Sequence, residues 1–173
     1  MNAEGLESFR DFVDSRSSAL LKTAVLLCGG DQHAGEDLLQ NALIKAAGRW
    51  QRIDEPEAYV RRVLYRQQVS RWRLKWPRRE FSVAEPPEAD GAGADPAAAT
   101  ELRLVMRQAL SRLTARQRTV LVLRYFEDLP EAEIAQIMGC SLGTVKSNVS
   151  RGLAKLREHH LVAVVSAPAQ KEG

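Results

Sequence analysis

The segment from Pro77 to Thr100 constrains the fold most, because it divides the 173-residue chain into two parts. It is rich in proline, glycine and alanine, and after Phe81 and Val83 it contains no large side chain that a core could bury. This composition favours a flexible, acidic linker over a packed element. Structureless loops of this length are uncommon inside one compact domain, so we expect a domain boundary here.

On both sides of this segment the apolar residues recur at helical spacing, and strand signals are absent. Asp31 is placed to cap a helix, Pro56 suits a first helical position, and Thr114 with Gln117 has the spacing of a capping box. The expected helices span residues 6–27, 32–47, 56–76, 102–113, 114–126, 131–138 and 142–160. We predict an all-α fold of two small helical domains joined by a flexible linker. The predicted boundaries are 1–76 for the first domain, 77–100 for the linker, 101–161 for the second domain and 162–173 for a tail.

Basic residues gather in two segments that are separated by the acidic linker. Between Ala58 and Arg79, and again between Leu142 and Arg157, every charged residue is a lysine or an arginine. Solvated helix faces usually mix acids among the bases, and these segments do not. Two acid-free segments therefore favour two surfaces that bind a polyanion such as nucleic acid.

The most specific pattern is the stretch 130–147, in which a short helix is joined by a tight turn to the start of a long one. Ile134, Met138 and Val145 are apolar where crossing helices bury a small core, and Gly139 can adopt the left-handed conformation that ends a helix. Ser141 can accept from the free amides that start the next helix. This pattern predicts a helix-turn-helix whose second helix enters the major groove of DNA. The predicted DNA contacts are Ser141, Gly143, Thr144, Lys146, Ser147, Asn148, Ser150 and Arg151.

A second candidate surface lies on the helix expected after Pro56. Arg61, Tyr65, Gln68 and Trp72 share one face at spacings of three and four, and further arginines flank them. Aromatic rings interleaved with arginines suit stacking on unpaired bases while the backbone is held electrostatically. The alternative is that Trp72 belongs to the ordinary core of the first domain.

Four motifs that occur in the same order resemble the extracytoplasmic-function sigma factors of bacterial RNA polymerase, and most closely the actinobacterial SigE-like subgroup. They lie at residues 36–42, 58–64, 116–126 and 143–147. The resemblance runs from about residue 6 to residue 161, which is nearly the whole chain. It implies sigma region 2, a helical bundle, in the first domain and sigma region 4, the helix-turn-helix, in the second.

The resemblance also implies partners and site residues. The implied partners are core RNA polymerase, through its clamp coiled coil and its flap, promoter DNA, and an anti-sigma factor as a further candidate. The helix-turn-helix is expected to recognise the −35 element, and the first domain is expected to open the −10 element. The residues implied for polymerase binding are Asp37, Leu38, Leu39, Gln40 and Asn41. Those implied for the −10 element are Trp50, Arg61, Arg62, Tyr65, Arg66, Ser70, Arg71, Trp72 and Arg73.

Two other classes of function compete with this interpretation. A stand-alone helix-turn-helix transcriptional regulator, with a sensor or dimerisation domain at its N-terminus, would explain the second basic segment but not the first. An enzyme could use His33 with Glu36 and Asp37 as an acid–base or metal cluster, but no nucleophile accompanies them. We therefore expect no catalytic residue, no metal and no cofactor.

The cysteines and the hydropathy of the chain indicate the cellular compartment in which the protein is expected. Cys28 and Cys140 lie far apart in sequence, which predicts neither a zinc site nor a disulfide framework. No apolar run approaches the roughly 18 residues of a membrane span. The acidic N-terminus does not have the pattern of a signal peptide. These observations predict a cytoplasmic protein without membrane insertion.

Overall fold

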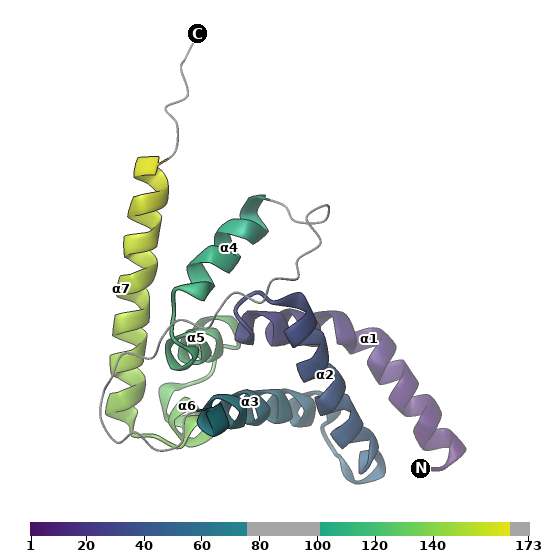
Figure 1. The fold of residues 1–173 in the computed structure, drawn as a ribbon. Coiled ribbons are helices and arrows are strands. Elements are labelled where there is room, and N and C mark those ends of the chain that lie inside the picture. The colour runs from purple at the N-terminus through teal and green to yellow at the C-terminus, as the bar shows by residue number, and fades with distance from the viewer. Residues whose placement is uncertain (76–100, 167–173) are drawn as a thin grey trace.

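All described elements of the computed structural model are helical, as the sequence predicts (Figure 1). The structure describes the backbone of residues 1–75 and 101–166 and the side chains of residues 1–73 and 104–159. The N-terminal unit consists of α1 (Ala3–Leu27), α2 (Gln32–Ala47), the 3-10 turn η1 (Trp50–Arg52) and α3 (Pro56–Lys75). The C-terminal unit consists of α4 (Glu101–Ser111), α5 (Ala115–Leu121), the π-helical turn η2 (Val122–Phe126), α6 (Glu131–Met138) and α7 (Leu142–Ser166). The expected linker at 77–100, like residues 167–173, lies outside the described residues.

Local signals place the helix ends of the N-terminal unit. Gly29 and Gly30 take positive φ angles of 71° and 85° directly after α1 and turn the chain towards α2. The Asp31 side chain then accepts from the backbone amide of Ala34 at 3.1 Å, which confirms the predicted cap. Pro56 begins α3, where its missing amide costs no helical hydrogen bond.

The core of the N-terminal unit lies where α1, α2 and α3 meet. Leu20, Leu38 and Leu64 are fully or almost fully buried there. Gly35 lets α2 approach α1 closely, since a Cβ at this position would lie 2.6 Å from a methyl carbon of Val25. The close crossing leaves no cavity for a side chain at position 35, as expected for a core packed to the density of an organic crystal.

The C-terminal unit contains the predicted helix-turn-helix in α6 and α7. Thr114 and Gln117 form the predicted capping box at the start of α5. Gly139 ends α6 with φ 64° and ψ 41°, the left-handed conformation that was expected. Ile134 is fully buried between these helices. The last helix, α7, continues to Ser166, beyond the end expected near residue 160, so the boundary proposed at residue 161 does not coincide with a helix end.

The two units are packed against each other, which the linker alone did not predict. Helix α3 contacts α5 and α6, and α1 contacts α5 and η2, so one buried apolar cluster runs through both units. In Figure 1, α6 lies beside the C-terminal end of α3. This packing decides which of the predicted site residues are accessible.

Candidate functional site

The start of α7 carries the eight DNA contacts predicted for the helix-turn-helix. The Ser141 hydroxyl accepts from the backbone amide of Thr144 at 3.1 Å, and the two hydroxyls are hydrogen bonded at 2.9 Å. This cap, predicted from the sequence, sets the direction of α7 after the tight turn at Gly139. Val145 is buried and anchors the helix on α6, so the opposite side faces outward.

The outward side of α7 is basic and polar. Lys146, Ser150 and Arg151 are exposed, as are Ser141 and Gly143 at the start of the helix. Half-buried positions are held by Thr144, Ser147 and Asn148. The side-chain amide of Asn148 donates one N–H to the Thr144 carbonyl at 2.8 Å, which leaves its oxygen and its second N–H available to another partner. The structure therefore brings the eight predicted residues together at one end of one helix.

The aromatic face of α3 is covered, in contrast to the prediction. Tyr65 and Trp72 are each 4% exposed because the C-terminal unit packs over them. The Arg116 guanidinium lies 5.0 Å from the centre of the Trp72 ring, and Arg73 lies on the same ring at 5.8 Å. Arg73 also donates to the Met138 carbonyl at the end of α6. In this conformation no nucleotide can stack on Tyr65 or Trp72.

The remaining residues predicted for the −10 element fall into three groups, one of which is the half-buried Arg61. Four are exposed on α3, namely Arg62, Arg66, Ser70 and Arg71. Trp50 is instead a core residue at 7% exposure, with its ring centre 5.0 Å from that of Phe9 and 5.1 Å from that of Phe12. The indole points inward, so Trp50 is not accessible to nucleic acid in this conformation.

The segment implied for polymerase binding is also split by its helical geometry. Asp37, Gln40 and Asn41 are exposed on α2, whereas Leu38 and Leu39 are 1% and 7% exposed. The two leucines lie on the side of α2 that packs inside the N-terminal unit, and we exclude them from the docking surface. Ile44, which the sequence reasoning did not single out, is 62% exposed on the same helix. It lies three and four positions after Asn41 and Gln40, so it shares their face.

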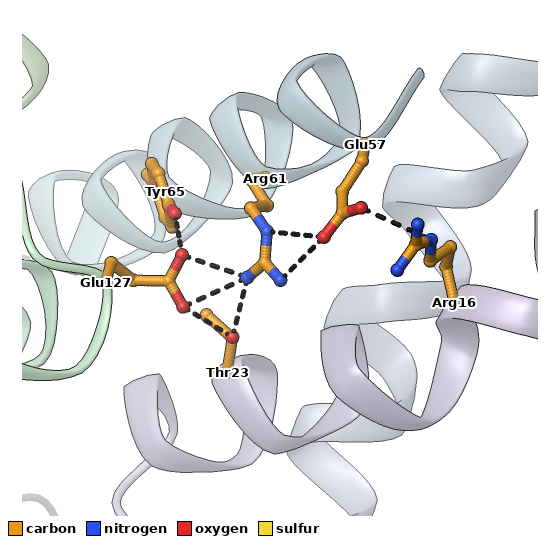
Figure 2. A network of polar contacts seen from close by, with 6 residues as sticks. All are labelled: Arg16, Thr23, Glu57, Arg61, Tyr65 and Glu127. Carbon is orange, nitrogen blue, oxygen red and sulfur yellow. Dashed lines mark hydrogen bonds and ion pairs between the residues drawn. The ribbon is translucent and has the colours of Figure 1, made fainter. Parts of the chain in front are cut away.

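A polar network joins the two units around a carboxylate that the sequence reasoning also missed. Glu127, which directly follows η2, accepts from Arg61 Nη1 at 2.9 and 3.0 Å, from Thr23 Oγ1 at 2.7 Å, and from the Tyr65 hydroxyl (Figure 2). Glu57 binds the other edge of Arg61 at 2.9 Å. No local pattern could have revealed this site, because Glu127 lies 66 residues after Arg61.

Burial and neighbouring charges shift the pKa values of Arg61 and Tyr65 in this network. Burial acts to lower the pKa of Arg61, but its hydrogen bond to Glu57 and the negative charge of Glu127 outweigh burial, so the pKa is raised. Burial is the main cause that raises the pKa of Tyr65, and its hydrogen bond to Glu127 acts in the same direction. At neutral pH the arginine is therefore charged and the phenol is a neutral donor.

Comparison with known proteins decides the family. Residues 103–156 match the family model described as Sigma-70, region 4. The chain is 35% identical over 164 residues to the RNA polymerase sigma-E factor of Streptomyces coelicolor, covering 93% of this chain and 90% of that relative. It is 26% identical over 166 residues to the ECF RNA polymerase sigma factor SigW of Bacillus subtilis, covering 88% of each. The chain belongs to the extracytoplasmic-function RNA polymerase sigma factors.

The fold of this sigma factor is shared by a solved relative. The sigma factor RpoE from Bartonella quintana, crystallised with the anti-sigma factor NepR, has a TM-score of 0.60 and 23% identity over 90% of this chain and 98% of that chain. Membership of the family means that the chain directs RNA polymerase to promoters, and the alternative of a stand-alone regulator is not favoured.

Metal binding and membrane insertion have no support in the described part of this sigma factor. Within residues 1–73 and 104–159, no group of histidine, cysteine and acidic side chains has the geometry of a metal site. The exposed His33 contacts only Glu36 among acidic groups of this part, at 3.9 Å. None of the described helices is long and apolar enough to cross a bilayer. Sigma factors are transcription initiation proteins, which is consistent with the expectation of no enzyme.

The thiol of Cys140 provides a test of the packing at this turn of the sigma factor. Burial raises the pKa of Cys140, although Arg116 and Arg73 partly oppose this. Because the thiolate is the reactive form, we expect iodoacetamide to alkylate Cys140 more slowly in the folded chain than in urea at pH 8. The rate is measured in a Cys28→Ala variant, and in the folded chain it should rise at a higher pH than in urea, where the thiol has its ordinary pKa. Equal rates in the folded and unfolded chains would contradict the burial of this thiol.

Proposed function

We propose that this sigma factor reads the −35 element with the first turns of α7. The observation that carries the proposal is the exposed, acid-free surface of Lys146, Ser150 and Arg151 directly after the tight turn at Gly139. Lysine and arginine at the start of a recognition helix pair with guanine edges or phosphates, and asparagine and serine hydrogen bond to base edges. The buried Val145 holds this surface on α6.

We further propose that α3 holds the separated −10 strand. Its exposed arginines, Arg62, Arg66 and Arg71, form a basic surface that can follow a phosphate backbone. Tyr65 and Trp72 supply the rings on which unpaired bases can stack, once the C-terminal unit has moved away. Stacking offsets part of the free energy of unstacking a flipped base, which is a few kcal/mol. Chemistry on the DNA and RNA is left to the polymerase.

The exposed face of α2 is our proposed docking surface for the polymerase clamp. Asp37, Gln40 and Asn41 supply polar contacts, and Ile44 supplies an apolar centre that is 62% exposed in the free chain. An apolar centre surrounded by polar groups is typical of a protein interface. The flap contact and an anti-sigma partner, both implied by the resemblance, remain predictions for this chain.

Replacing Ile44 by serine is expected to weaken the affinity for core RNA polymerase on the order of tenfold, as for a central interface residue. The unfolding temperature should not change, because the side chain is already exposed. Affinity is measured by titrating fluorescently labelled sigma factor with purified core polymerase. Leu6→Ser is the matched control, since Leu6 is a 41% exposed leucine on α1. If Ile44→Ser binds core RNA polymerase with wild-type affinity, the proposal that this face of α2 contacts the polymerase is wrong.

A further inference from the structure

We propose that Glu127 is an intramolecular latch that occupies the DNA-binding groups of α3 and keeps the free sigma factor closed. The inference rests on the role proposed above for α3 in holding the −10 strand. The Glu127 side chain is 6% exposed, and it connects the C-terminal unit to Arg61, Tyr65 and Thr23 of the N-terminal unit (Figure 2). Arg61 and Tyr65 are residues that would otherwise contact nucleic acid.

The carboxylate of Glu127 presents the same chemistry as a phosphate of the DNA backbone. Both are oxyanions with two oxygens that a guanidinium can bind through parallel N–H groups. Arg61 Nη1 donates to both carboxylate oxygens of Glu127, at 3.0 and 2.9 Å. A phosphate can therefore bind Arg61 in this way only after Glu127 has left. The latch and the strand compete for one guanidinium.

The rest of the interface is built for close approach of arginines. Gly29 has positive φ, and a Cβ there would lie 3.0 Å from an Arg118 nitrogen. Gly139 also has positive φ, and a Cβ there would lie 2.6 Å from an Arg73 nitrogen. Arg118 is 1% exposed and donates to the Leu27 carbonyl at 3.1 Å, at the C-terminal end of α1, where a cation is favoured. The surfaces of the two units are therefore complementary in shape at these positions.

The closed arrangement cannot bind both promoter elements. The names of the −35 and −10 elements give their positions, which differ by about 25 base pairs. This is roughly 85 Å along B-DNA at about 3.4 Å per pair. Here Arg73 of α3 is hydrogen bonded to Met138, four residues before α7 begins. The two proposed DNA-binding surfaces lie side by side and must separate before transcription starts.

The interface also contains a polar group that the closed state leaves unpaired. The indole nitrogen of Trp72, whose ring lies against Arg116 of the C-terminal unit, is buried without a hydrogen-bond partner in the described part of the chain. Buried unpaired groups destabilise the closed state, whereas opening returns them to water. The charged contacts of Glu127 oppose this effect. Polymerase affinity is reduced by the fraction of closed molecules, since only the open fraction can bind productively.

The test is single-molecule energy transfer on the full chain. Dyes are placed at Glu7→Cys on α1 and Arg157→Cys on α7, both exposed positions, in a background of Cys28→Ala and Cys140→Ala. Glu127→Gln removes the charge from one side of the latch, and Thr23→Val removes a hydroxyl from the other. We expect each to raise the ratio of open to closed molecules on the order of tenfold, the loss of one hydrogen bond to a charged group.

Glu133→Gln is the matched control. Glu133 is an exposed acid that lines the same groove as Glu127 and Arg61, and it forms no ion pair with a described residue. It should leave the ratio of open to closed molecules unchanged. Wild-type ratios in both Glu127→Gln and Thr23→Val would overturn the latch.

Run-off transcription with core polymerase then tests inhibition. Glu127→Gln should lower the sigma-factor concentration that gives half-maximal transcript, with the maximal transcript unchanged. Opening of the chain without this fall would overturn the inhibitory role of the latch. Failure of the proposed role of α3 is distinguishable, because replacing its exposed Arg62, Arg66 and Arg71 by alanine would then leave promoter-dependent transcription unchanged. Energy transfer would still decide whether Glu127 holds the units together.

Discussion

Replacing Lys146 and Arg151 together by alanine is expected to lower transcription from a cognate promoter by about thirtyfold or more, because each interaction with a base or phosphate contributes about 1–3 kcal/mol and the pair therefore about 2 kcal/mol at least. Both side chains are exposed on the outward side of α7. The affinity of the holoenzyme for promoter DNA should also become less dependent on salt, by up to about one unit of slope for each phosphate that is no longer bound. Run-off transcription at several salt concentrations measures both effects.

The control for this pair lies on the same helix. Arg157 is an exposed arginine beyond the first turns of α7, so Arg157→Ala removes a positive charge away from the proposed groove contact. It should retain most of the promoter-dependent transcription. Neither group of variants should change the unfolding temperature much, because exposed side chains contribute little to stability. Wild-type transcription by the double variant would mean that α7 is not the reader of the −35 element.

Trp50→Ala is expected to lower the free energy of unfolding of the N-terminal unit by about 3–5 kcal/mol, the usual cost of truncating a buried tryptophan. The ring packs against Phe9 and Phe12, and its indole nitrogen lies 3.4 Å from the Ser8 hydroxyl, to which it donates. Since small domains are stable by only about 5–15 kcal/mol, part of the chain should be unfolded at 37 °C. Urea denaturation followed by circular dichroism measures this change.

Trp50→Phe separates a core role from a role in base contact. Phenylalanine keeps most of the apolar surface between Phe9 and Phe12, so this variant should recover most of the stability that Trp50→Ala removes. A residue that only contacted DNA would behave differently: its alanine variant would unfold at the wild-type urea concentration and lose promoter opening alone. That outcome would return Trp50 to the nucleic-acid surface.

The parts of the fold that depend on neighbouring residues could be predicted from the sequence. Asp31 and Ser141 bond to amides three residues away, and Gly139 needs only its missing side chain to take a positive φ. These interactions are decided within one turn of chain. The same is true of the outward face of α7, because the burial of Val145 leaves Lys146 and Arg151 on other sides of the helix.

Assignments that depended on which side of a helix is covered were less successful. Leu38 and Leu39 lie inside the N-terminal unit, so the docking surface that we propose keeps only the polar positions of the motif, together with Ile44. A helix with apolar residues on more than one side offers several faces for burial. Which of these faces is buried depends on where α1 and α3 pack against α2. The residues of α2 alone do not determine this packing.

The sequence by itself determined the all-helical fold, the helix-turn-helix and its basic surface, because helix periodicity, caps and turns depend on residues close in the chain. Only the tertiary structure decided that the aromatic face of α3 is covered and that Glu127 binds Arg61, 66 residues earlier. Contacts of this kind arise when two separately specified units pack together. Their partners are chosen by the shape and charge of whole surfaces, which no local pattern records.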